Sequence, residues 1–282
     1  EYVRSESRAG RMGSTLMATV AEGTRQRIYL PPSSEQSDAA IVPLPDNVPP
    51  GELFDWPGRI NVVRYGLTTF ASLFTPRQLT ALTTFSDLVG EARDKALHDA
   101  LAAGLPTGDR LDNGGVGAEA YADAVATYLG FAISRTTNKS STICSWDSSP
   151  KMEAVRSVFA RQALPMSWDY AEASPWGGSG GDFVEDLSWV SKALSRVPAF
   201  IDGRGMQSDA SKSVSETSII STDPPYYDNV SYAALSDFFY VWLRRSLKGV
   251  YPDLFRTLLT PKEEELIADP FRHGGKEEAR RH

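Results

Sequence analysis

The chain has 282 residues, of which 41% are hydrophobic and 23% charged, and its mean hydropathy is -0.30. This is globular composition, and the length is enough for a substantial hydrophobic core. One cysteine, Cys144, and three scattered histidines exclude a disulfide framework and a cysteine- or histidine-based cluster, so no metal site is expected. With no apolar run near the roughly 18 residues of a membrane span and no signal peptide, the expectation is a cytoplasmic protein without a membrane partner.

The formal net charge of -7 argues against a protein whose whole surface binds nucleic acid, but it is compatible with a local basic site. The first 30 residues hold five arginines against three acidic residues. These arginines are either part of such a site or a solvated face of ordinary kind.

Prolines are frequent in residues 31–59, where they exclude a continuous helix or central strand, so this segment is expected to be a linker. Thr75, Pro76 and Gln78 then predict a helix start, because threonine caps, proline suits the first helical position and glutamine closes a capping box. Apolar residues at helical spacing carry this helix to about residue 103. After a glycine-rich break, a second helix is expected at about 118–133.

Ser149-Pro150 predicts a third helix, and Asp182 with Glu185 predicts the capped start of a fourth, directly after a glycine-rich loop at 173–182. Residues 202–218 are polar and indicate a loop, whereas 217–222 form the clearest strand candidate. A long aromatic helix is predicted at about 231–248. Residues 260–261, Thr-Pro, predict a last helix whose charged run 262–265 is a solvated first turn.

Residues 221–228 read Ser-Thr-Asp-Pro-Pro-Tyr-Tyr-Asp and lie between the strand candidate and a helix, where α/β folds place ligand sites. Consecutive prolines fix φ, remove two backbone donors and leave rigid carbonyls. Asp223 and the Pro224 carbonyl are then suited to accept both N–H bonds of an amine, while Tyr226 stacks on the ring that carries it. A nucleic-acid base with an exocyclic amine, extruded from its duplex, fits this arrangement.

Asp-Pro-Pro-Tyr after a strand resembles the catalytic motif of S-adenosylmethionine-dependent amino methyltransferases. Longer strings resemble one branch, the large bacterial and archaeal adenine-specific DNA methylases with an N-terminal domain of unknown function. These strings are Tyr65-Gly66-Leu67-Thr68-Thr69-Phe70, Leu73-Phe74-Thr75-Pro76-Arg77-Gln78-Leu79, Val158-Phe159-Ala160-Arg161-Gln162-Ala163-Leu164-Pro165-Met166, Trp168-Asp169-Tyr170-Ala171-Glu172-Ala173, Thr222-Asp223-Pro224-Pro225-Tyr226-Tyr227-Asp228-Asn229-Val230 and Leu235-Ser236-Asp237-Phe238-Phe239-Tyr240-Val241-Trp242-Leu243-Arg244-Arg245.

The resemblance covers about residues 10–272 and implies an α/β fold, a partial Rossmann-like methyltransferase with a mostly helical insertion. It implies methyl transfer from S-adenosylmethionine to adenine N6 in double-stranded DNA, with partners in a modification or phage-defence system. Three segments follow: an N-terminal segment and linker (1–59), a helical insertion that recognises the target (60–200), and an incomplete catalytic part (201–282). The implied catalytic residues are Asp223, Pro224, Pro225 and Tyr226, and the implied substrate-binding residues are Tyr227, Asp228, Arg161 and Gln162.

The family's cofactor motif, Asp/Asn-Pro-Phe-x-Gly-x-Gly, does not occur in this sequence. The glycine-rich stretch 177–182 is interpreted as a loop, so no cofactor-binding residue is assigned and the chain is expected to be an internal piece of a longer enzyme. Two alternatives stay open. One is the same chemistry on cytosine N4, RNA or a glutamine amide, although such cytosine and glutamine enzymes usually begin the motif with Ser or Asn. The other is a non-catalytic module that binds DNA or a partner.

Overall fold

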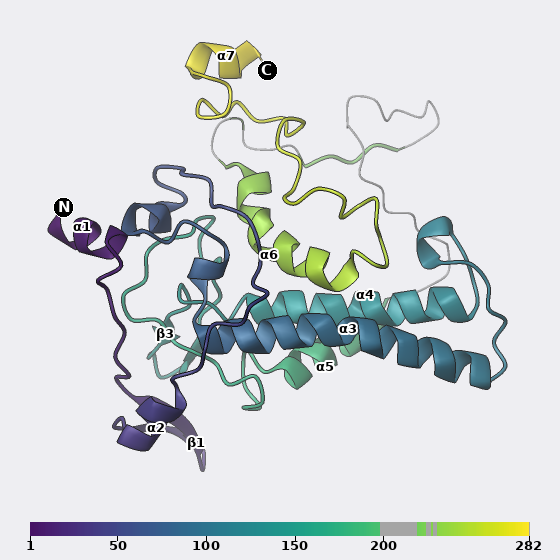
Figure 1. Cartoon of the computed structure of the whole chain (residues 1–282), viewed down its shortest axis with the longest axis horizontal. Coiled ribbons are helices and arrows are strands. Elements are labelled where there is room, and N and C mark those ends of the chain that lie inside the picture. Colours follow the sequence, from purple (N-terminus) through teal and green to yellow (C-terminus); the bar gives the residue numbers. More distant parts are fainter. Residues whose placement is uncertain (198–218, 224–226, 228–229, 282) are drawn as a thin grey trace.

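The computed structural model describes residues 1–197, 219–223, 227 and 230–281, which form a mixture of helices and two small antiparallel hairpins (Figure 1). The α-helices are α1 (Tyr2–Arg8), α2 (Ser34–Ala39), α3 (Pro76–Ala102), α4 (Ala118–Thr137), α5 (Phe183–Leu194), α6 (Tyr232–Leu247) and α7 (Lys276–Arg281). Short 3-10 helices are η1 (Asn61–Tyr65), η2 (Ala71–Leu73) and η3 (Leu111–Asn113). One hairpin pairs β1 (Thr19–Gly23) with β2 (Gln26–Leu30), and the other pairs β3 (Trp146–Asp147) with β4 (Ala154–Val155).

The start of α3 confirms the predicted capping box. The Gln78 amide N–H donates to the Thr75 hydroxyl at 3.2 Å, and the Thr75 N–H donates to the Gln78 side-chain oxygen at 2.9 Å. Four apolar residues of the predicted stripe are buried along this helix: Leu79, Leu82, Phe85 and Val89. The helices predicted at 118–133 and 231–248 are likewise present as α4 and α6, and α4 continues four residues further than expected.

Helices α3 and α4 lie side by side as a long hairpin, and α6 packs across both (Figure 1). The buried face of α4 is built mainly from small residues, which lets its neighbours approach closely. Gly130 is the tightest point, since a Cβ there would lie 2.9 Å from a methyl group of Leu247 at the end of α6. None of the helices among the described residues has both the length and the apolar character of a membrane crossing.

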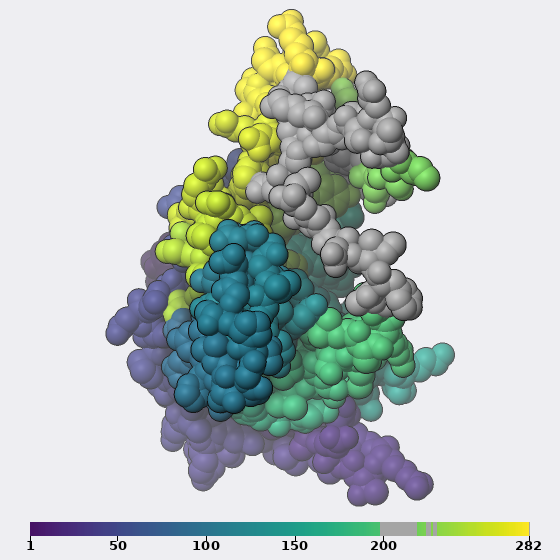
Figure 2. Space-filling view, turned by 90° about the vertical axis from the view of Figure 1, so that its right-hand side faces the viewer, coloured from purple at the N-terminus to yellow at the C-terminus, as the bar shows by residue number. Residues whose placement is uncertain are grey.

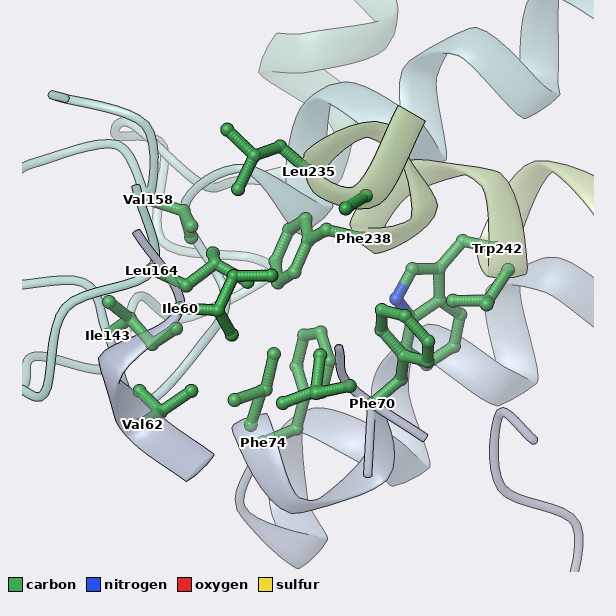
Figure 3. Packing of buried hydrophobic residues seen from close by; sticks show 14 of the residues in the cluster. Ile60, Val62, Phe70, Phe74, Ile143, Val158, Leu164, Leu235, Phe238 and Trp242 are labelled. Carbon is green, nitrogen blue, oxygen red and sulfur yellow. The ribbon is translucent and has the colours of Figure 1, made fainter. Parts of the chain in front are cut away.

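The main hydrophobic core surrounds the first half of α6, where aromatic rings converge (Figure 3). Phe74 stacks on Phe238 with centroids 5.6 Å apart and meets Trp242 edge-on at 5.3 Å. Segments distant in the sequence contribute to this one cluster, including Leu53 and Trp56 from the proline-rich region. That region, although largely irregular, is therefore partly buried and also contains α2.

A polar hub joins the middle of the helical hairpin to the end of α6. Asp123, fully buried on α4, accepts hydrogen bonds from Arg93 Nε at 2.7 Å and Arg110 Nε at 2.6 Å. Arg110 also donates to the Gly249 carbonyl at 2.8 Å. Burial raises the pKa of Asp123, but the hydrogen bonds from Arg110 and Arg93 outweigh it and hold the pKa below its usual value.

Helix α5 begins as predicted, with Asp182 accepting from the Glu185 N–H at 2.8 Å. Only Asp186 of this helix is fully buried, and it accepts from Arg135 Nε at 2.8 Å and the Thr136 hydroxyl at 3.0 Å. Burial raises the pKa of Asp186, and these hydrogen bonds offset only part of the effect.

The helix predicted at Ser149-Pro150 is wrong, because the segment forms a turn and strand β4. Asp147 accepts from the Ser149 N–H at 2.9 Å and from Arg156 Nη2 at 2.8 Å, which closes the β3–β4 hairpin. The same contacts, those of Ser149 first, lower the pKa of Asp147 to about 2. Ser149 thus serves a local turn, a use of serine that competes with helix capping.

The last predicted helix is also wrong, because residues 260–265 are irregular. Thr260 uses its hydroxyl to bond Asp237 Oδ1 at 2.7 Å, so it caps nothing downstream. The strand predicted at 217–222 is absent over its described part, 219–222. Its first two residues, and the loop predicted at 202–218, lie outside the described residues. The coarse expectation of helices with few strands is confirmed, and no Rossmann sheet occurs in the described parts of the chain.

Candidate functional site

The Asp-Pro-Pro-Tyr motif begins at the periphery of the molecule. Residues 219–223, which end in Asp223, are all exposed and extend along the edge seen at the upper right of Figures 1 and 2. Ile219 and Ile220 are 101% and 62% exposed, which is unusual for adjacent apolar residues. Pro224, Pro225, Tyr226 and Asp228 lie outside the described residues.

Tyr227 is described, and its backbone has a left-handed φ of 48°. A non-glycine residue in this region is uncommon and marks a tight reversal of the chain. Its side chain is exposed, and its carbonyl accepts a hydrogen bond from the Ala268 N–H at 2.9 Å. The end of the motif is therefore tied by backbone to the segment that follows α6.

Three residues after Tyr227 the chain enters the core, with Val230 and Ser231 buried. The first turn of α6 has no cap from its own N-cap side chain. Instead, Glu265 accepts from the Ala233 N–H at 2.9 Å and from the Ser231 hydroxyl at 3.1 Å. A carboxylate at this position also opposes the positive end of the helix dipole.

Arg272 holds Glu265 in place. Its Nη1 donates to Glu265 Oε2 at 2.5 Å, and its Nη2 bonds the Ser231 hydroxyl. Asp269, also buried, lies 3.5 Å from Arg272 Nε. The guanidinium stands over the ring of Phe54, 5.7 Å from its centroid.

A second attachment lies one turn further along α6. Buried Asp237 accepts from the Thr260 N–H at 2.8 Å and pairs with Lys262 Nζ at 2.6 Å. We call residues 260–272 the clamp, because they bind both the end of the motif and the first half of α6. The clamp fixes the chain immediately after the motif, whereas the motif's first carboxylate is open to solvent.

The clamp was missed by sequence reasoning, which wrongly took the run at 262–265 for a solvated first turn. Glu265 is only 13% exposed and Lys262 only 24%. The contacts join residues 23 to 41 positions apart, for example Asp237 with Thr260 and Ser231 with Arg272. Local sequence pattern carries no signal for such pairs.

Arg161 and Gln162, the two implied substrate contacts outside the motif, are both exposed. They precede Leu164, which bridges to Ile60, and Arg59 Nη1 donates to the Gln162 carbonyl at 3.3 Å. No contact between described residues joins either of them to Asp223 or Tyr227.

The basic end of α6 has a structural role, since Arg245 donates two hydrogen bonds to Asp87, at 2.8 and 2.6 Å.

The glycine-rich loop 177–181 does not fit S-adenosylmethionine. Asp182 already binds one of its backbone donors, accepting from the Gly178 N–H at 2.9 Å. A Cβ on Gly180 would lie 2.6 Å from Lys139 Nζ, so a side chain fills the space beside the loop. The segment is a loop, as expected from the sequence, and it offers no cradle for this cofactor.

Two shallow grooves occur in the described structure. One, about 330 Å³, is apolar and lies between α3 and the start of the glycine-rich loop, where Phe85 and Trp176 line it. The other, about 240 Å³, adjoins the polar hub at Arg93 and Arg110. Within the described residues no group of three His, Cys, Asp or Glu side chains is placed to hold a metal ion.

The single cysteine, Cys144, is buried. Burial raises the pKa of its thiol to about 12, so this thiol is inert as a nucleophile.

Comparisons of the chain with protein-family models, with curated proteins and with solved structures each gave no match.

Proposed function

We propose that this chain carries the base-binding part of an S-adenosylmethionine-dependent DNA methyltransferase that acts on adenine N6. In this proposal Asp223 and the Pro224 carbonyl accept the two N–H bonds of the target amine. Tyr226 stacks on the extruded base, and Pro225 keeps the backbone between them rigid. Tyr227 and Asp228 complete the pocket wall, and double-stranded DNA is the partner.

The observation that supports the proposal best is the contrast between the two ends of the motif. Asp223 is exposed, whereas the chain from Tyr227 onwards is bonded to the clamp and then buried in the core. A carboxylate that must meet a flipped base has to be accessible, and it needs a rigid support to hold its geometry.

The glycine-rich loop 177–181 does not fit the methyl donor, because Asp182 bonds its backbone and Lys139 fills the space beside it. We therefore assign the described residues to binding and orienting the base alone. A Rossmann-like methyltransferase fold, with the helices 60–200 as a target-recognising insertion, belongs to this proposal and is not visible in the described sheets.

The test is methyl transfer in the natural protein that contains this chain. Labelled S-adenosylmethionine and duplex DNA are incubated with the unchanged protein, Asp223→Asn and Asp223→Ala, and the nucleosides are analysed by mass spectrometry. We expect N6-methyladenine with the unchanged protein and at least a hundredfold loss in both variants, since positioned polar groups of this kind are typically worth about 10²–10³ in rate.

Asp253→Asn is the matched control, because Asp253 is also an exposed carboxylate but lies after α6, away from the motif. It should retain full activity. Retained activity in Asp223→Ala would contradict the assignment, and N4-methylcytosine as product would move it to cytosine.

A second candidate, a module that binds DNA or a partner without catalysis, is favoured by the lack of a cofactor cradle in the glycine-rich loop 177–181. Calorimetry separates the two. Binding of duplex DNA without any binding of S-adenosylmethionine by the natural protein would support the second candidate.

A further inference from the structure

Most arginines of the helical part are paired with carboxylates. Arg77, Arg93, Arg110, Arg135 and Arg245 each have an acidic partner within 3 Å. By contrast, Arg8, Arg64 and Arg161 have no carboxylate within 4.0 Å in the described parts of the chain. Arg8 and Arg161 are exposed, and Arg64 is half-buried. Their positive charges are available to an external anion.

The fold brings two of these arginines together although they are 56 positions apart. Helix α1 lies against η1 (Figure 1), and Arg8 Nε donates to the Arg64 carbonyl at 3.1 Å. The contact is close, since a Cβ on Gly66 would lie 3.2 Å from the Arg8 Cα. One helical turn earlier, Arg4 stands over the ring of Tyr65 with its guanidinium 5.5 Å from the centroid.

Tyr65 in turn contacts the segment that follows Leu164. Leu164 forms an isolated parallel bridge with Ile60, directly before η1. Tyr65, at the end of η1, meets Trp168 edge-on at 5.3 Å, and Trp168 is 55% exposed. We call Arg4, Arg8, Arg64, Tyr65 and Trp168 the arginine face. Arg161 lies three residues before Leu164, and no contact between described residues joins it to this face.

Acidic residues near this face are few and partly neutralised. Glu6 is bound by Arg11 through two bonds of 2.6 and 2.8 Å, and Glu1 lies 4.0 Å from Arg4. Asp169, next to Trp168, is exposed. The far half of the α3–α4 hairpin is different: residues 91–123 hold seven acidic against three basic residues. That end would repel a polyanion.

We infer that the arginine face binds the phosphate backbone of duplex DNA. Unpaired arginines match phosphate oxygens with charge-assisted hydrogen bonds, and such contacts position a protein without reading sequence. The exposed Trp168 provides an apolar surface against the sugar edge. Only the choice of DNA as the polymer rests on the proposed function, because the surface itself is defined by its charges.

The test is binding of a fluorescent duplex to the natural protein, followed by anisotropy over a series of salt concentrations. Each phosphate contact contributes about 0.9 to the slope of log affinity against log salt. The pair Arg8→Gln with Arg64→Gln should therefore reduce the slope by about 2 and the affinity by about tenfold or more at 0.1 M salt.

Arg256→Gln is the matched control, because Arg256 is exposed and without a described acidic partner but lies after α6. It should leave the slope unchanged. The inference is overturned if the slope of the variant with Arg8→Gln and Arg64→Gln equals that of the unchanged protein, or if a single-stranded or duplex RNA of equal length binds more tightly and with the same arginine dependence. If the variants lose duplex binding as expected while the unchanged protein transfers no methyl group, the proposed function fails and the arginine face stands.

Discussion

The helical core and the clamp hold the same helix, α6, by opposite means. The core buries aromatic and aliphatic side chains against it, among them Phe74, Phe238 and Trp242. The clamp, residues 260–272, binds its first half through polar and charged groups. Thr260 and Lys262 bind Asp237, and Glu265, held by Arg272, accepts from the Ala233 N–H. Apolar packing is tolerant of direction, whereas charged hydrogen bonds fix distances and angles.

The difference matters for the motif that precedes α6. Core packing makes the helix stable, but it does not determine where the chain before Val230 points. The clamp does so, because it bonds Tyr227, Ser231 and Ala233 at three successive places. We therefore expect changes in the core to lower the stability of the whole protein, and changes in the clamp to act mainly on the motif.

The largest effect is expected for Trp242→Ala. Trp242 is fully buried, so removing its ring should lower the free energy of unfolding by about 4 kcal/mol, measured by urea titration. Trp242→Phe is the control. The indole N–H has no hydrogen-bond partner among the described residues, so phenylalanine removes that penalty and should cost much less. Equal losses in both variants would contradict this account.

The next largest is Asp123→Asn, which leaves Arg93 and Arg110 without their buried carboxylate. We expect the free energy of unfolding at pH 7 to fall by about 3 kcal/mol, whereas the control Asp112→Asn, at an exposed position, should change it hardly at all. Because the pKa of Asp123 is lowered in the folded state, its stabilisation is present above the unfolded value of about 3.9 and is lost as pH falls through the folded value. The difference in free energy of unfolding between Asp123→Asn and the unchanged protein should therefore become smaller below about pH 4.

Those two sites differ in how far the sequence predicts them. The helices α3, α4 and α6 follow from apolar spacing and from the capping box at Thr75. Trp242 belongs to the long aromatic helix predicted at about 231–248, and it is buried there. The hub at Asp123 was not foreseen, because a charged residue on a helix is normally solvated and its partner Arg110 lies in an irregular loop.

The two helices that were wrongly predicted have a common physical cause. Ser149 and Thr260 are both followed by proline and both resemble helix caps, yet each is held by an aspartate elsewhere: Asp147 accepts from the Ser149 N–H, and Asp237 accepts from the Thr260 hydroxyl. For Thr260 the partner is Asp237, 23 positions away. The candidate site shows the same limit: the sequence suggests Asp223 and Tyr226 by residue type, but the clamp residues, which bond Tyr227 and the first half of α6, have no motif.

A smaller and more local effect is expected for Glu265→Gln. The amide still accepts from the Ala233 N–H but loses its charge toward Arg272, a loss of about 2 kcal/mol for a charged hydrogen bond. Hydrogen exchange should rise in residues 227–235 and 260–272 and stay unchanged in α3. Glu264→Gln, at the exposed neighbouring position, is the control. Faster exchange spread over α3 and α4 would show that the clamp supports the whole fold and not the motif alone.

The smallest effect, and one of opposite sign, is expected for Asp186→Asn. The pKa of Asp186 is raised in the folded state, so the stability linked to this group is fully present below about pH 3.9 and is lost as pH rises through the folded value. An asparagine is neutral throughout and still bonds Thr136. Between about pH 4 and 7 the free energy of unfolding of Asp186→Asn should therefore rise relative to that of the unchanged protein, by less than about 1 kcal/mol. Urea titrations at several pH values, with Asp123→Asn in parallel, should give two curves of opposite trend, because in one site the arginines outweigh burial and in the other burial outweighs Arg135.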